Sequence, residues 1–478
     1  MLFNSLVFIL LFLPITLGGY WLLNRWRLFD CAKLFLVFAS LFFYAYWEIS
    51  FLPLIVISIV VNYFIGTWLA HHLDRLYLLR RVFLFVGVTL NLLALGWFKY
   101  IDFLIYNYNV LFAGNLAAMD IALPLAISFF TFQQIAYLVD SFYGKTRQYN
   151  FFTYVLFVSF FPQLIAGPIV SHDELIPQFE DKSKRTPNWR NIYWGTIIFL
   201  MGLTKKTVVA DTFAVYATSG FDVVQSLDFV SAWFSSLSYT VQIYFDFSGY
   251  CDMALGVALM FNILLPINFD SPYKALDIQD FWRRWHITLS RFLRNYIYIP
   301  LGGNRRGQRR ACVNIFVGFL LGGLWHGAAW TFVVWGALHG IANVVVRVWH
   351  WMGGRFGRFW AWFITFNFIN VTWVFFRATS FQSANKVLSG MVDFRSIENV
   401  NVEQSLELLG ADWAALLGLI GVLVFCVVAP NSLEISRKFL DYTKRFAKYI
   451  PVMLALVTFL LLMKMIVLPY SEFIYFNF

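Results

Sequence analysis

The chain has 478 residues, of which 60% are hydrophobic and 13% are charged, and its formal net charge is +10. Soluble domains average about 25% charged residues, so a chain this poor in charge must expose much of its surface to lipid. The positive charge does not indicate a nucleic-acid partner, because the basic residues stand in short runs between apolar stretches, as in the cytoplasmic loops of membrane proteins.

Apolar stretches long enough to span a membrane, about 20 residues each, recur along the whole chain. They predict about eleven membrane segments, some of them re-entrant, and a retained first helix rather than a cleaved signal peptide. The candidates lie near residues 4–24, 31–47, 50–70, 82–98, 120–142, 151–170, 191–204, 229–245, 250–267, 312–348, 359–376, 414–431 and 450–469. We therefore expect an all-α polytopic protein with one membrane domain over 1–478, a catalytic core at 120–345, and C-terminal helices and a tail at 359–478.

The charged loops predict an orientation. Basic residues in the loops 25–33, 75–81, 182–190 and 437–448 place these loops in the cytoplasm by the positive-inside rule. The loop at 393–412 is acidic and is expected outside. The last helix would then start inside and end outside, so the C-terminal tail is predicted to be extracytoplasmic.

Two segments do not fit simple helix counting. Residues 270–310 alternate Arg and Lys with aromatic residues, which is typical of an amphipathic helix lying in the cytoplasmic interface with its aromatic rings at headgroup level. Residues 312–348 are too long for one span, are interrupted by Gly322, Gly323, Gly327 and Gly336, and are flanked by Arg310 and Arg347. Non-helical backbone at membrane depth is tolerated when it lies inside the protein or lines a cavity, so this segment is predicted to break there and line one.

Histidines are the strongest candidates for chemistry. His326 lies at the centre of GGLWHGAAW in the broken segment, and an ionisable residue inside a membrane is a functional candidate by default. His286 lies in FWRRWHITLSRF; its alternative is a place on a basic interfacial face. On a continuous helix His339 would point away from His326 and could face the same cavity only if the helix breaks, so a packing role is expected for it. The remaining histidines are expected to be solvated: His71, His72, His172 and His350.

Metal and nucleophile motifs are absent from the sequence. There is no HExxH, CxxC or GxSxG pattern, and the four cysteines are far apart, so no metal site or disulfide framework is predicted. Asp246 and Asp252 in YFDFSGYCDMALG are interpreted as buried structural carboxylates paired with arginine or with backbone donors. The loop GGNR, which contains Asn304 and Arg305, is a weak phosphate-binding pattern.

A long run of these motifs resembles the membrane-bound O-acyltransferases. The run FDFSGYCDMALGVALMFNILLPINFDSPY, followed by DFWRRWHITLSRFLRNYIYIPLGGNRRG and GGLWHGAAWTFVVWGALHG, is nearly continuous over 244–340. PLAISFFTFQQIAYLVDSFYG, FFPQLIAGPIV and VTWVFFRA also fit. The most similar branch contains bacterial alginate and peptidoglycan O-acetyltransferases and the D-alanyl transfer protein of teichoic acid synthesis. The resemblance implies transmembrane helices with re-entrant and interfacial helices around a central funnel or tunnel.

The resemblance also implies roles for three residues. The defining Trp-His-Gly histidine of the family falls on His326, and the Arg-Trp-His histidine falls on His286. The terminal FIYFNF is similar to a Phe-Ile-Tyr-Phe motif of this branch, which suggests Tyr475 as a transient acyl carrier. The alternative for Tyr475 is an aromatic anchor at the membrane interface.

The expected mechanism is acyl transfer from a cytoplasmic thioester, with acetyl-CoA as the donor, no tightly bound cofactor and no metal. His326 would be the general base for an attacking hydroxyl, and His286 would orient the donor or stabilise developing charge. Substrate-binding roles are expected for Arg283, Arg284, Trp325, Asn304 and Arg305, since Arg forks suit phosphate. The expected partner is an extracytoplasmic SGNH-type, esterase-like polysaccharide acetyltransferase, and the expected location is the bacterial inner membrane.

Other functions fit parts of the same pattern. Interrupted helices with intramembrane polar groups are also found in transporters and channels, although no internal repeat is evident here. Within the enzyme class, D-alanyl transfer to teichoic acid is the second candidate, and transfer to a lipid or protein acceptor is the third. The sequence does not identify the polysaccharide.

Overall fold

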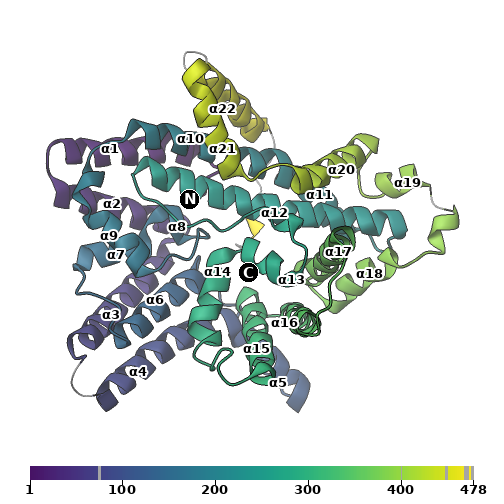
Figure 1. The fold of residues 1–478 in the computed structure, drawn as a ribbon, viewed down its shortest axis with the longest axis horizontal. Helices are drawn as coiled ribbons and strands as arrows, with labels where there is room; N and C mark the ends of the chain where they lie inside the picture. The colour runs from purple at the N-terminus through teal and green to yellow at the C-terminus, as the bar shows by residue number, and fades with distance from the viewer. Residues whose placement is uncertain (74–76, 400, 447–449, 468–472, 475–478) are drawn as a thin grey trace. The chain divides into compact units, whose positions relative to one another are not determined.

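The computed structural model describes residues 1–73, 77–399, 401–446, 450–467 and 473–474, and this part of the chain is helical (Figure 1). Phe269 and Trp285 form an isolated antiparallel β-bridge. The chain divides into two compact units. The first comprises Met1–Leu200, Tyr250–Ile267 and Thr443–Val467, and the second comprises Met201–Gly249, Asn268–Tyr442 and Leu468–Phe478. The all-α prediction is confirmed, whereas the single domain stays a prediction.

The first unit is built from helices in the N-terminal part of the chain and one near the C-terminus. They are α1 (Leu13–Arg25), α2 (Phe29–Ala45), α3 (Leu52–His71), α4 (Tyr77–Leu95), α5 (Ile101–Phe112), α6 (Ile127–Phe142), α7 (Phe151–Ser159), α8 (Phe161–Leu164), α9 (His172–Glu180), α10 (Trp189–Thr204) and α22 (Ile450–Val467). Helices α3, α4 and α6 pack side by side (Figure 1). The buried amides of Asn62 on α3 and Asn91 on α4 bond each other, with Asn91 Nδ2 2.7 Å from Asn62 Oδ1. Such amide pairs link apolar helices that lack a hydrophobic driving force in lipid.

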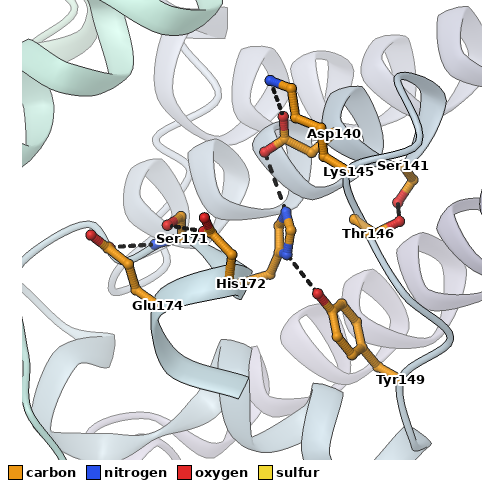
Figure 2. A network of polar contacts seen from close by, with 9 residues as sticks. Asp140, Ser141, Lys145, Thr146, Tyr149, Ser171, His172 and Glu174 are labelled. Carbon is orange, nitrogen blue, oxygen red and sulfur yellow. Dashed lines mark hydrogen bonds and ion pairs between the residues drawn. The ribbon is translucent and has the colours of Figure 1, made fainter. Parts of the chain in front are cut away.

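A polar network centred on His172 corrects the expectation that this histidine is solvated (Figure 2). His172, the first residue of α9, is only 2% exposed. Its Nδ1 lies 2.8 Å from the Tyr149 hydroxyl, and its Nε2 lies 3.3 Å from a carboxylate oxygen of Asp140 on α6. The other oxygen of Asp140 pairs with Lys145 at 3.2 Å. The histidine thus joins three segments of the first unit, and its buried nitrogens both have partners, as buried polar groups require.

The second unit contains most of the signature motifs. Its helices are α11 (Asp211–Thr218), most of α12 (Phe229–Met260), α13 (Ile278–Arg284), α14 (Ile287–Leu293), α15 (Gln308–His326), α16 (Trp330–Trp351), α17 (Arg358–Arg377), α18 (Phe381–Met391), α19 (Val402–Glu407), α20 (Trp413–Val428) and most of α21 (Ser432–Phe446). A π-helical turn over Lys205–Ala210 precedes α11. Turns of this kind recur at functional sites, where they re-aim individual side chains.

Helices α15 and α16 form a tight hairpin. A Cβ atom added at Gly323 would lie 2.4 Å from the Phe332 carbonyl oxygen and 2.8 Å from Gly336 Cα. Only glycine at these two positions allows the backbones to approach this closely, as in other small-residue crossings of membrane helices. The predicted break in the segment 312–348 is confirmed, because α15 ends at His326 and α16 begins at Trp330.

Five helical stretches in the described part of the chain are long and apolar enough to cross a membrane. They are Phe8–Arg25, Ile49–His71, Tyr77–Phe112, Trp330–Trp351 and Arg358–Arg377, and a sixth exists if the pair Trp413–Val428 and Ser432–Phe439, bent by 76°, counts as one span. The protein is therefore a multi-pass membrane protein. The expected total of eleven segments is not confirmed.

The segment 270–310 differs from the single interfacial helix expected for it. It is divided into short helical elements, among them α13 and α14 with His286 between them. Its tryptophans do not sit at a surface, since Trp282 is 6% and Trp285 is 1% exposed. The alternation of basic and aromatic residues was misleading because Phe281, Trp282, Trp285 and Phe292 are buried in protein, while Arg283 remains exposed.

Candidate active site

His326 is the last residue of α15 and lies beside a helix break. Gly327 and Ala329 have extended backbone, with φ of −162° and −146°, which ends α15 before α16 can begin. The His326 side chain is 3% exposed, and its ring centroid lies 5.1 Å from each of Trp335 and Phe376. The carboxyl end of a helix carries partial negative charge, so this position favours an imidazole that gains a proton.

His286 occupies the junction between α13 and α14 in a left-handed conformation, with φ of 44°. This region costs a non-glycine residue about 1–3 kcal/mol and persists only where the surroundings hold it. Here Asn268 provides the restraint: its carbonyl accepts the Ile287 N–H at 3.1 Å and its side-chain oxygen accepts the Thr288 N–H at 3.1 Å. On the other side of the histidine, the Asp270 N–H donates to the Arg284 carbonyl at 2.9 Å.

The imidazole of His286 is fully buried. Neither of its ring nitrogens has a hydrogen-bond partner among the residues that the structure describes. Burial lowers the pKa of His286, which lies outside the helices able to span a membrane, to about 3, so the ring is neutral at physiological pH. A buried polar group without a partner costs about 1–3 kcal/mol, and such groups usually face water or a ligand.

Trp325 packs near both histidines. Its ring centroid is 6.2 Å from that of His286 and 4.9 Å from that of His326, and the side chain is 4% exposed. In the described part of this unit, the Ser290 hydroxyl on α14 and the Trp335 indole nitrogen on α16 also lack partners. Ring contacts thus place both family histidines, Trp325 and Trp335 in one aromatic cluster.

His339 belongs to the same cluster as a packing residue. The helix break after His326 removes the continuous-helix argument that placed His339 on the far side, because Trp335 packs against both rings, at 4.7 Å from His339 and 5.1 Å from His326. Trp282 Nε1 donates to His339 Nδ1 at 3.2 Å. An indole N–H only donates, so Nδ1 accepts and the neutral ring carries its proton on Nε2.

The expected substrate-binding residues outside the cluster have different settings. Arg284 Nε donates to both Asp280 carboxylate oxygens, at 3.0 and 3.1 Å, so this N–H of the guanidinium is already used within α13. Arg283, Asn304 and Arg305 are exposed. The loop that carries Asn304 and Arg305 is fixed by Asn314 on α15, whose amide donates to the Gly303 carbonyl at 2.9 Å.

Tyr475 lies outside the described residues, but the two residues before it have defined contacts. The Ile474 N–H donates to Asp246 Oδ2 at 2.8 Å, and Phe473 is 2% exposed. Asp246 also pairs with Lys206 at 2.8 Å. The prediction that Asp246 is a buried, partnered carboxylate is confirmed, with lysine rather than arginine as the cation. Sequence reasoning did not identify Lys206, although two consecutive lysines within MGLTKKTVVA were a usable signal.

A separate cavity of about 250 Å³ in the second unit is lined by residues that include Lys205, Tyr244, Cys426 and Ser432. None of the predicted site residues lines it. In the described residues, no group of three or more His, Cys, Asp or Glu side chains is arranged to hold a metal ion.

Comparisons with known proteins agree with this arrangement of motifs. The model of the MBOAT, membrane-bound O-acyltransferase family matches residues 143–384, which include His286 and His326. The chain belongs to this family. It is therefore an O-acyltransferase, and the plain transporter or channel considered from the sequence is not its function.

Two groups of MBOAT proteins are similar over most of the chain. A peptidoglycan O-acetyltransferase of Helicobacter pylori is 51% identical over 83% of this chain and 81% of its own length. A probable alginate O-acetylase AlgI of Pseudomonas aeruginosa is 39% identical over 82% of this chain and 75% of its own length. A teichoic acid D-alanyltransferase of Streptococcus thermophilus is 25% identical over 47% of this chain and 57% of its own length.

Proposed function

We propose that this enzyme takes acetyl groups from cytoplasmic acetyl-CoA and passes them across the bacterial inner membrane for O-acetylation of peptidoglycan. The main support is the 51% identity to a peptidoglycan O-acetyltransferase over 83% of the chain. O-acetylation of alginate is the second candidate, supported by 39% identity to probable alginate O-acetylases over 82% of the chain. D-alanyl transfer has weaker support, because that likeness covers 47% of the chain at 25% identity.

In the proposed reaction His326 is the general base. It takes the proton from a hydroxyl while the hydroxyl oxygen forms a bond to the thioester carbonyl carbon. The tetrahedral intermediate then collapses with cleavage of the C–S bond, and His326 returns the proton to the departing CoA sulfur. The imidazolium that exists between these steps lies at the carboxyl end of α15, where the helix dipole stabilises a cation by about 0.3–1 kcal/mol.

His286 has the complementary role in this proposal. A neutral imidazole has one N–H, which can donate to the oxygen that becomes negative in the tetrahedral intermediate. Two observations support it: the ring nitrogens have no partner among the described residues, and the backbone is held in one strained conformation. A donor fixed before the reaction begins needs no reorganisation when charge develops, and removing one such donor typically lowers kcat by about 100- to 1000-fold.

The remaining parts of the proposal concern delivery and release. Tyr475 would carry the acetyl group transiently as an ester, since a phenol with pKa near 10 is easier to deprotonate than a sugar hydroxyl. Arg283, Arg284, Asn304 and Arg305 would hold the phosphates of acetyl-CoA at the cytoplasmic mouth, and Trp325 would pack against the acyl group between the histidines. An SGNH-type extracytoplasmic partner would then esterify the polysaccharide.

The test is acetyl transfer by the purified protein given radiolabelled acetyl-CoA, with intact-mass analysis. The variants are His326→Gln, Tyr475→Phe and, as a matched control, His350→Gln, because His350 also lies on this helical hairpin and is exposed. We expect label on the native chain and on His350→Gln, and none on the other two variants. Label that survives His326→Gln would contradict the base, and label that survives Tyr475→Phe would contradict the carrier.

The polymer is tested in cells. Deletion of the gene should remove O-acetyl groups from isolated muropeptides while leaving other wall components unchanged. Loss of acetyl groups from an exopolysaccharide with muropeptides unaffected would favour the alginate-type alternative, and loss of D-alanine esters would favour the third.

A further inference from the structure

A buried ion-pair cluster in the second unit is unexplained by the proposed chemistry. Lys206 lies on the π-helical turn before α11 and is 4% exposed. Its ammonium lies 2.8 Å from a carboxylate oxygen of Asp211 and 2.8 Å from Asp246 Oδ1. Removing charges from water is expensive, so a buried ion-pair cluster is weak evidence for a purely stabilising role.

The second oxygen of Asp246 makes a contact over a long distance in sequence. Asp246 Oδ2 accepts the Ile474 backbone N–H at 2.8 Å, across 228 positions. The neighbouring Phe473 ring lies 5.9 Å from Phe247, which follows Asp246 on α12, and Phe247 lies 4.9 Å from the His286 ring. The carboxylate therefore holds the chain at a point two ring contacts away from a proposed active-site histidine.

We propose that Asp246, oriented by Lys206, is a positioning residue that docks the C-terminal segment at the histidine cluster through the Ile474 N–H. This inference rests on the proposed function, in which the residue after Ile474 carries the acetyl group. It adds the hydrogen bond that would position the C-terminal segment for that step. A hydrogen bond from the Ile474 backbone N–H does not depend on the Ile474 side chain. In this proposal Asp246 fixes the position of the segment along its own length, and the packing of Phe473 against Phe247 makes the docking specific.

The charges of the cluster suit this task. With all three groups ionised, the cluster has one more carboxylate than ammonium, so Lys206 cannot neutralise both acids and Asp246 retains acceptor strength for an N–H donor. Asp246 is 1% exposed, which keeps water from competing for its outer oxygen. Hydrogen bonds to a charged group contribute about 1.5–3 kcal/mol, which corresponds to about 10- to 150-fold in the docking equilibrium.

Hydrogen–deuterium exchange of the Ile474 amide measures docking without any need for catalysis. The experiment uses the full-length protein in detergent, with fragmentation that resolves single C-terminal amides. In the native chain this amide should exchange slowly. Asp246→Ala removes the acceptor and should accelerate exchange at least about 10-fold, and Asp246→Asn, which keeps a weaker acceptor oxygen, should fall between. The matched control is Asp211→Asn, which alters the same ion cluster and leaves the Asp246 acceptor in place.

Radiolabelled acetyl transfer on the same samples separates the inference from the proposed function. We expect Asp246→Ala to lower kcat for transfer at least about 10-fold with little change in KM for acetyl-CoA, provided its thermal midpoint matches that of Asp211→Asn. Equal Ile474 exchange in native and Asp246→Ala proteins would overturn docking, as would an unprotected amide in the native chain. Faster exchange with unchanged transfer would overturn the positioning role alone. Protected exchange in a native chain that transfers no acetyl group would support docking and contradict the proposed function.

Discussion

Substitution of Gly323 by alanine should damage the site through the backbone of the α15–α16 hairpin. The new Cβ would lie 2.4 Å from the Phe332 carbonyl oxygen and 2.8 Å from Gly336 Cα. Both contacts are with backbone, which cannot rotate away, so the helices must separate by close to 1 Å to restore van der Waals distance. Overpacking of this kind costs about 1–3 kcal/mol.

The same movement reaches the chemistry, because His326 follows Gly323 by less than one helical turn. A misplacement of about 1 Å can lower a rate by about 100-fold, so Gly323→Ala should lose transfer activity beyond its loss of stability. Gly318→Ala is the matched control: Gly318 is on the same helix and a Cβ there meets no atom within 4 Å. That variant should be as active as the native chain and slightly more stable, since alanine favours a helix over glycine by about 1 kcal/mol.

The assay is thermal unfolding in detergent together with labelled acetyl transfer at a temperature well below every midpoint. Equal activity and equal midpoints for the two alanine variants would refute the argument that the glycine contact positions His326. A lower midpoint with full activity would show that the contact stabilises the hairpin without aligning the histidine.

Three further predictions concern other buried polar groups. Burial lowers the pKa of His286 from 6.5 to about 3, so the unfolded chain binds more protons than the folded chain between these pH values. Acidification below pH 6.5 should therefore lower the free energy of unfolding by up to about 1.4 kcal/mol per pH unit. His286→Gln should reduce this pH dependence, as measured by thermal unfolding at pH 7.5 and 5.5. His172→Phe leaves Asp140 and Tyr149 short of a partner and should lower the thermal midpoint by the equivalent of about 1–3 kcal/mol, more than Tyr149→Phe does; equal effects would contradict the network. Asp228→Ala removes the acceptor of the 2.8 Å hydrogen bond from the Ser231 N–H at the start of α12. The free energy of unfolding should fall by about 1 kcal/mol in the same thermal measurement, and an unchanged midpoint would show that this helix cap does not stabilise the protein.

The break beside His326 could be predicted because it depends on local features. A segment too long for one span, interrupted by glycines, must turn, and the histidine in its centre is then at the turn. The aromatic cluster around the two histidines was partly foreseen through the family motifs. For its third histidine, His339, the sequence predicted a packing role, and a place near His326 only if the helix breaks, as it does after His326.

The errors concern residues whose surroundings come from distant parts of the chain. His172 reads as a loop residue, and its burial depends on Asp140 and Tyr149, which no periodicity connects to it. The partner of Asp246 lies forty positions upstream on a π-helical turn, a feature with no clear sequence signal. The tryptophans of 270–310 have the composition of an interfacial belt, and only tertiary packing decides that they are internal.

The left-handed backbone at His286 has a consequence for mutagenesis. Asparagine tolerates positive φ better than other non-glycine residues, whereas alanine and β-branched residues do not. An alanine scan would therefore delete the imidazole and disturb the turn together, and would overstate the contribution of the ring. Asparagine at this position would isolate the imidazole, and glycine would reveal how much of any loss comes from a relaxed turn.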